Sequence, residues 1–161
     1  MQTINEKEAM LDKLNSEFSE VTTYMERAVD REPIHQVEQE MFRKLMQIGR
    51  SLLEYFIYQS GTGYQANNPL RSEDGKALTF KGIVESPYFS IFGEVKIKRA
   101  GYSSETEEYV YPLDAQLNLP EKKFSYLLQK WILARSAETD FREAVDWYNE
   151  IFDRSFFPSM Q

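Results

Sequence analysis

Hydrophobic residues recur every seven positions along the first sixty residues of the chain. Between residues 3 and 30 one row consists of Ile4, Leu11, Phe18 and Met25, and a companion row of Leu14, Val21 and Ala28. Two apolar rows at heptad spacing are typical of a long helix with a narrow packing seam. We therefore predict a helix over residues 3–30.

The same spacing returns after Pro33. Its first row consists of Ile34, Met41, Ile48 and Tyr55, and its second of Leu45 and Leu52. We predict a second helix that runs to about Gln59, before the glycine-rich break at residues 60–63. Gly49 inside it costs about 1 kcal/mol relative to alanine, so we expect a neighbouring helix to approach closely there. The two helices predict either an antiparallel hairpin within one chain or a dimeric coiled coil, because a narrow seam buries little surface alone.

The hydrophobic pattern changes after a turn-rich stretch over residues 64–76. Aromatic and β-branched residues with partial alternation then mark four strand-like segments, at residues 78–84, 88–92, 93–99 and 109–111. In the third segment Val95 and Ile97 face one way, and Glu94, Lys96 and Lys98 face the other. We expect a small antiparallel sheet of three to four strands.

Helical spacing resumes after Pro120. We predict a helix over residues 121–136, with Pro120 at its tolerant first position, and a second helix that starts with Thr139 as its N-cap. Residues 153–155 are expected to form a turn, and residues 156–160 begin a further element. This order is that of a helix-turn-helix unit whose reading helix is cut short. The alternative, which the pattern alone favours, is an ordinary helical hairpin.

The predicted fold class is therefore α+β, in three parts. Residues 1–63 form an N-terminal helical hairpin that could serve as a dimerisation arm. Residues 64–112 form the β module, and residues 113–161 form a C-terminal helical pair.

Composition excludes several classes of protein. The chain has no cysteine, so disulfides and thiolate metal sites are excluded. No apolar run is long enough for a membrane span, so we expect a cytoplasmic protein with no membrane partner. The net charge is −7, but residues 41–100 carry 9 basic and 5 acidic groups between two acidic ends. A basic middle can face a phosphate backbone, and it can equally be a mixed, solvated surface.

Candidate catalytic chemistry is sparse. The single histidine, His35, stands at a predicted helix start and lacks the spacing of a catalytic triad. Asp114, in the corner Pro112-Leu113-Asp114, is expected to cap the turn by accepting backbone N–H bonds. We therefore predict no catalytic residue, no metal site and no cofactor.

The basic residues are the remaining candidates for a site. The predicted DNA-binding set is Lys96, Lys98, Arg99, Lys122, Lys123, Lys130 and Arg135. Lys96 and Lys98 share a strand face, and such a row can hold phosphates without reading bases. The alternative is an edge strand that its lysines protect from aggregation.

Three blocks of the sequence carry a resemblance to a known family. They are residues 38–54, with Gln47-Ile48-Gly49-Arg50-Ser51-Leu52-Leu53-Glu54; residues 92–102, with Gly93-Glu94-Val95-Lys96-Ile97-Lys98-Arg99; and residues 111–141, with Tyr111-Pro112-Leu113-Asp114 and Leu117-Asn118-Leu119-Pro120. Together they resemble the N-terminal half of bacterial insertion-sequence transposases of the ISKra group.

The resemblance implies a DDE-type transposase whose three metal-binding carboxylates lie downstream of the matched blocks. Many relatives also carry a zinc ribbon, whose cysteines are absent here, so we expect aromatic packing to hold the sheet. The leading hypothesis is a non-catalytic N-terminal transposase fragment that binds element-end DNA and helps to assemble a homodimer. The alternative is a protein-interaction and dimerisation module that binds no nucleic acid. An enzyme in its own right is the weakest hypothesis.

Overall fold

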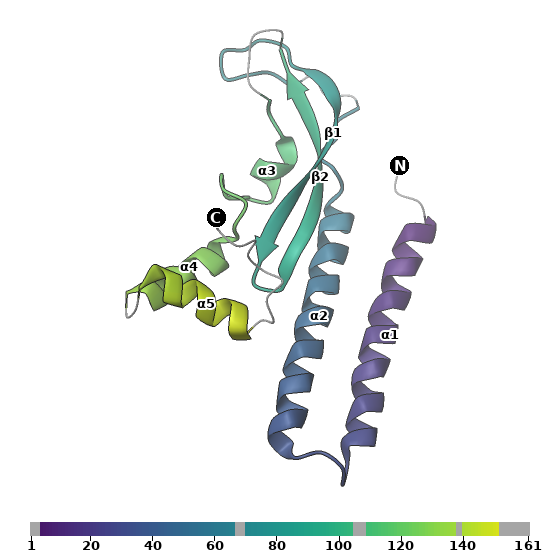
Figure 1. Cartoon of the computed structure of the whole chain (residues 1–161). Coiled ribbons are helices and arrows are strands. Elements are labelled where there is room, and N and C mark those ends of the chain that lie inside the picture. The colour runs from purple at the N-terminus through teal and green to yellow at the C-terminus, as the bar shows by residue number, and fades with distance from the viewer. Residues whose placement is uncertain (1–3, 67–69, 105–108, 138–139, 152–161) are drawn as a thin grey trace.

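The computed structural model describes residues 4–66, 70–104, 109–137 and 140–151, and it has an α+β fold (Figure 1). Helix α1 (Ile4–Ala28) and helix α2 (Ile34–Ser60) lie side by side and run in opposite directions. Asp30, with a φ of 59°, lies in the turn between them, and Pro33 directly precedes α2. The predicted hairpin within one chain is confirmed.

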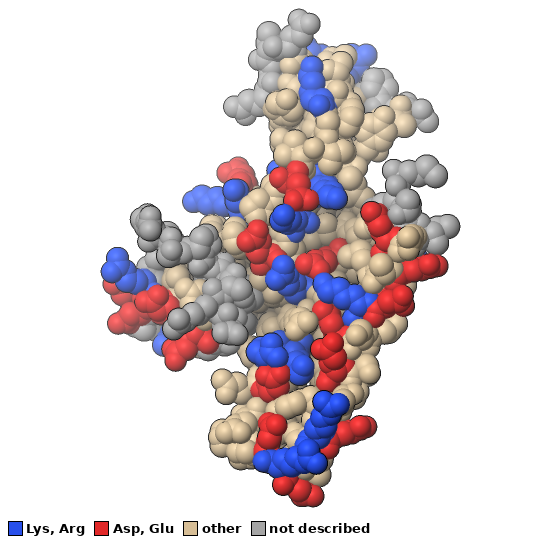
Figure 2. All heavy atoms as spheres, turned by 45° about the vertical axis from the view of Figure 1, so that its right-hand side comes forward, with Lys and Arg blue, Asp and Glu red and all other residues tan. Residues whose placement is uncertain are grey.

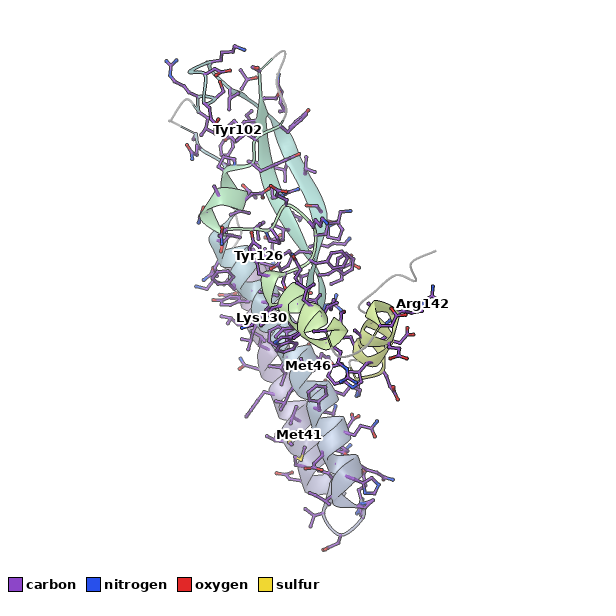
Figure 3. All side chains as sticks on the ribbon, turned by 90° about the vertical axis from the view of Figure 1, so that its left-hand side faces the viewer. Met41, Met46, Tyr102, Tyr126, Lys130 and Arg142 are labelled. Atoms are coloured by element: carbon purple, nitrogen blue, oxygen red, sulfur yellow. The ribbon has the colours of Figure 1, made fainter. Side chains whose placement is uncertain are left out.

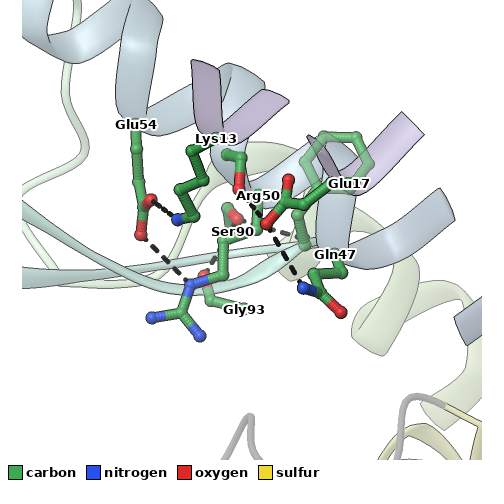
Figure 4. Close-up of polar contacts among 9 residues, drawn as sticks. Lys13, Glu17, Gln47, Arg50, Glu54, Ser90 and Gly93 are labelled. Atoms are coloured by element: carbon green, nitrogen blue, oxygen red, sulfur yellow. Dashed lines mark hydrogen bonds and ion pairs between the residues drawn. The ribbon is translucent and has the colours of Figure 1, made fainter. Parts of the chain in front are cut away.

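The contact between α1 and α2 contains a polar layer near its middle (Figure 4). The Glu17 side chain is only 7% exposed, and its Oε1 accepts hydrogen bonds from Gln47 Nε2 at 3.2 Å and Ser51 Oγ at 3.0 Å. Lys13 Nζ pairs with Glu54 at 3.2 Å on the same side of α2. Thus α2 turns polar side chains toward α1, and its apolar heptad rows are not the seam of this hairpin.

A single long β-hairpin forms the sheet. Strand β1 (Thr79–Ser90) pairs antiparallel with strand β2 (Gly93–Ser103), and the register places Tyr88 opposite Val95. The prediction of three to four strands is wrong: the described residues hold a two-stranded sheet. The first two predicted segments join into the one strand β1 because Pro87 keeps the chain extended, and residues 91–92 form the turn. Residues 109–111 contribute only an isolated bridge, from Val110 to Tyr102.

Two hydrophobic clusters fix the hairpin to the helices. In the first, Ile57 of α2 packs with Val95 and Ile97 of β2 and with Leu113 of the short helix α3 (Pro112–Gln116). In the second, Phe89 packs with residues of the C-terminal helices: Leu128, Ile132 and Tyr148. The far end of the hairpin is held by aromatic contacts, with Phe80 5.7 Å from Tyr102 and 5.0 Å from Tyr64 between ring centres.

Gly49 lies against the turn of the β-hairpin. A Cβ atom at this position would come within 2.5 Å of the Phe92 ring. A close approach at Gly49 is therefore present, but the neighbour is an aromatic ring from the β-turn and not the helix that the sequence led us to expect.

The C-terminal helices are α4 (Tyr126–Ser136) and α5 (Phe141–Ile151). The first begins five residues later than predicted, because residues 123–125 run beside β1 and exchange backbone hydrogen bonds with Phe89. Ser125, and not Pro120, opens the helix: its Oγ accepts a hydrogen bond from Leu128 N. The predicted N-cap Thr139 and the predicted further element over residues 156–160 lie outside the described residues.

Candidate functional site

The basic strand is partly neutralised in the structure. The Lys96 side chain is exposed, and its Nζ lies 3.1 Å from the Glu85 carboxylate on the neighbouring strand. Lys98 is also exposed, and Glu85 is its partner in the strand register. One glutamate thus stands beside both lysines, which lowers the positive potential of this row.

Arg99 differs from its neighbours because it is half-buried. Its guanidinium donates a hydrogen bond to Asp114 Oδ2 and lies 4.2 Å from the centre of the Tyr111 ring. Asp114 therefore holds Arg99, and the described contacts give it no backbone N–H to cap. Burial raises the pKa of the Asp114 carboxyl, Arg99 opposes the shift, and burial prevails. This cluster ties α3 to β2.

The four other predicted residues lie in or just before α4. Lys122, Lys123 and Lys130 have exposed side chains, whereas Arg135 is half-buried and its guanidinium lies 5.3 Å from the centre of the Trp147 ring. Arg135 therefore helps to join α4 to α5. Among the residues that the structure describes, no ion pair involves Lys98, Lys122, Lys123 or Lys130.

A cleft of about 580 Å³ lies between the helical hairpin and β2. Its lining combines acidic and basic side chains, among them Glu54, Glu94, Arg50 and Lys98. Figure 2 shows the same interleaving of positive and negative residues over the adjoining surface. A wall with both signs of charge selects neither an anion nor a cation, so the cleft has no clear ligand chemistry.

The most distinctive surface is apolar and lies on the helical hairpin. We call it the hairpin face, and it consists of Leu11 and Phe18 on α1 and of Ile34, Met41, Leu45, Leu52 and Phe56 on α2. Large side chains are exposed along its whole length: Phe18 is 63% exposed, Leu45 51% and Phe56 56%. Figure 3 shows Met41 on the lower half of α2, below the β-hairpin and the α4–α5 pair.

Helical geometry places both parts of the hairpin face on one side. Successive residues turn by about 100°, so Leu45 and Leu52 lie about a third of a turn from Gln47 and Ser51, which face α1. On α1, Leu11 and Phe18 lie about a quarter turn from the buried residues Val21 and Ala28. Both rotations away from the contact run in the same sense along the chain. Because the helices are antiparallel, the rotations bring the exposed residues of α1 and α2 to the same side of the pair.

Sequence reasoning found these apolar rows but not their orientation. A signal was available in the polar positions of α2: Glu40, Lys44, Gln47, Ser51 and Glu54 recur every three or four residues. That second stripe is the one that packs on α1, through Glu17 and Lys13. Two stripes on one helix indicate two different neighbours.

Comparison of the chain with protein families, curated proteins and solved structures finds no match in any of the three. None of the described helices is both long and apolar enough to cross a membrane. Within the described ranges, no group of three or more His, Asp or Glu side chains is placed to hold a metal ion.

Proposed function

We propose that this chain is a non-catalytic assembly module, of the kind that the front end of an insertion-sequence transposase supplies. The observation that carries the proposal is the hairpin face. Large apolar side chains that stay exposed along two antiparallel helices mark a protein-interaction surface, because isolated monomers rarely leave contiguous apolar patches of this extent open to water. The resemblance in residues 38–54, 92–102 and 111–141 supports DNA transposition as the process in which the module acts.

The polar layer between α1 and α2 supports this role. Glu17, Gln47 and Ser51 hold the two helices in one register without using the apolar rows of α2. The hairpin is thus a two-sided element: one side of α2 fixes the fold, and another side is available to a neighbour.

Retention by a tagged transposase tests the proposal. An ISKra-group transposase with its catalytic core, immobilised by a tag, should retain the untagged chain, and Leu45→Glu with Leu52→Glu should remove that retention by placing charges in the apolar contact. The matched control is Gln36→Glu with Gln39→Glu, which adds the same charge at exposed positions off the hairpin face. A chain that is neither retained nor self-associated at high micromolar concentration would refute the assembly role.

A second candidate function, DNA binding, is favoured by one observation. Lys98, Lys122, Lys123 and Lys130 remain exposed and outside the ion pairs of the described residues. Such lysines can contact phosphates, which gives affinity without base specificity. The interaction module without nucleic acid is the alternative.

Gel shifts at low salt distinguish DNA binding from an interaction module that binds no nucleic acid. If the lysines hold DNA, the chain should shift both terminal-repeat and random duplexes, and Lys122→Ala with Lys123→Ala should lower the salt slope by about 0.9 for each phosphate that the variant no longer neutralises. Lys7→Ala with Lys81→Ala removes the same charge from exposed positions elsewhere and should leave the slope unchanged. Failure of the unmodified chain to shift either duplex would rule DNA binding out.

A further inference from the structure

We propose that the hairpin face is covered by a second copy of this chain, with α2 of one copy packed antiparallel on α2 of the other. This inference rests on the assembly role and names its partner. The product is a bundle of four helices, in which the two α2 helices form the centre and the two α1 helices flank them.

The distribution of exposed residues puts α2 at the centre. It contributes five members of the hairpin face, whereas α1 contributes two. Four of the five, Ile34, Met41, Leu45 and Leu52, belong to the two heptad rows of α2, and the half-buried Ile48 and Tyr55 complete the first row. This is the pattern of a helix that packs along its length on one other helix. No described residue of the same chain fills that position, since α1 contacts the polar stripe of α2 instead.

One charged residue fixes the relative direction of the two helices. Glu38 lies in the same heptad row as Leu45 and Leu52. A parallel pair would place Glu38 against its own copy, which like-charge repulsion disfavours. In an antiparallel pair the layers become Met41 with Leu52, Leu45 with Ile48, and Glu38 with Tyr55, so no two charges of one sign meet.

The size of the face matches what a stable dimer requires. Helix α2 has 27 residues and is therefore about 40 Å long. Two helices with axes about 10 Å apart present a face about 20 Å wide, or roughly 800 Å² on each copy. That is the contribution of each partner to a standard-size specific interface. Because a two-fold contact is self-complementary, heptad rows on α2 that are apolar apart from Glu38 suit a second copy of themselves.

Sedimentation velocity gives the first test. The full chain should sediment as a dimer of the 19.0 kDa chain at tens of micromolar, and Leu45→Glu with Leu52→Glu should convert it to a monomer. Both side chains are about half exposed in the single chain, so helix content by circular dichroism should stay unchanged. Gln36→Glu with Gln39→Glu should remain dimeric.

Disulfide trapping tests the antiparallel arrangement, and no native cysteine competes with the introduced pair. Mixed Met41→Cys and Leu52→Cys chains should form a linked heterodimer on oxidation, whereas each variant alone should form little, because identical positions lie far apart. Linked homodimers of Met41→Cys would show a parallel contact and overturn the inference. A monomeric chain that the tagged transposase still retains would overturn the second copy as partner while leaving the assembly role in place.

Discussion

Among individual residues, the half-buried pair of Arg99 and Asp114 ties β2 to α3. The Arg99 guanidinium lies between the carboxylate and the Tyr111 ring, so it serves the fold and is poorly placed to contact a phosphate. The predicted DNA-binding role of Arg99 therefore receives no support from its position. The side chains of Lys122 and Lys123 are better placed, since both are exposed.

Replacement of Asp114 by asparagine should lower the free energy of unfolding by about 1 kcal/mol near neutral pH, because an NH2 group takes the place of one carboxyl oxygen and cannot accept a hydrogen bond from Arg99. Burial raises the pKa of Asp114 in the folded chain, so the folded state holds this proton more tightly than the unfolded state. The carboxyl then stabilises the fold most at acid pH, and less as the pH rises through the folded pKa.

The decrease in the free energy of unfolding caused by Asp114→Asn should therefore be larger near pH 3 than near pH 7. Urea unfolding of the unmodified chain and of the variant at both pH values measures it. Asp12→Asn, at an exposed position of α1, should show neither effect. A loss that grows toward neutral pH would mean that Arg99, and not burial, controls this carboxyl.

Among the helices and strands, the contact of Gly49 with Phe92 sets how closely α2 approaches the β-hairpin turn. Gly49→Ala should destabilise the chain by about 1–3 kcal/mol, because the new Cβ meets the ring, even though alanine favours the helix by about 1 kcal/mol. Chemical unfolding of Gly49→Ala, Phe92→Ala and the double variant measures how much of this free-energy penalty comes from the contact. In a Phe92→Ala background the same substitution should be neutral or stabilising; an equal penalty in both backgrounds would refute the contact.

The elements themselves were largely predictable, because local rules govern them. The heptad spacing indicated both long helices, and the glycine at position 61 marked the end of α2 within one residue. The number of strands in the sheet was not predictable, because nothing in the local sequence distinguishes one strand over residues 79–90 from two short strands that meet at Pro87. The start of α4 was missed because residues 123–125 pair with a residue distant in the sequence, Phe89.

In the molecule as a whole, the two long helices leave an apolar face uncovered beside a polar contact that holds them together. Periodicity identified the apolar rows, but which row meets α1 depends on the tertiary arrangement that Glu17, Gln47 and Ser51 stabilise. For the same reason the hairpin and the dimer do not exclude each other: the hairpin is present, and we expect a second copy to bind its outer face.

Sedimentation velocity of the unmodified chain beside its Leu45→Glu, Leu52→Glu variant is the sharpest test of the proposed dimer. We expect twice the chain mass for the first and the single chain mass for the second, with the same helix content in both. A single chain mass for the unmodified protein at high micromolar concentration, or an undiminished dimer in the variant, would contradict it.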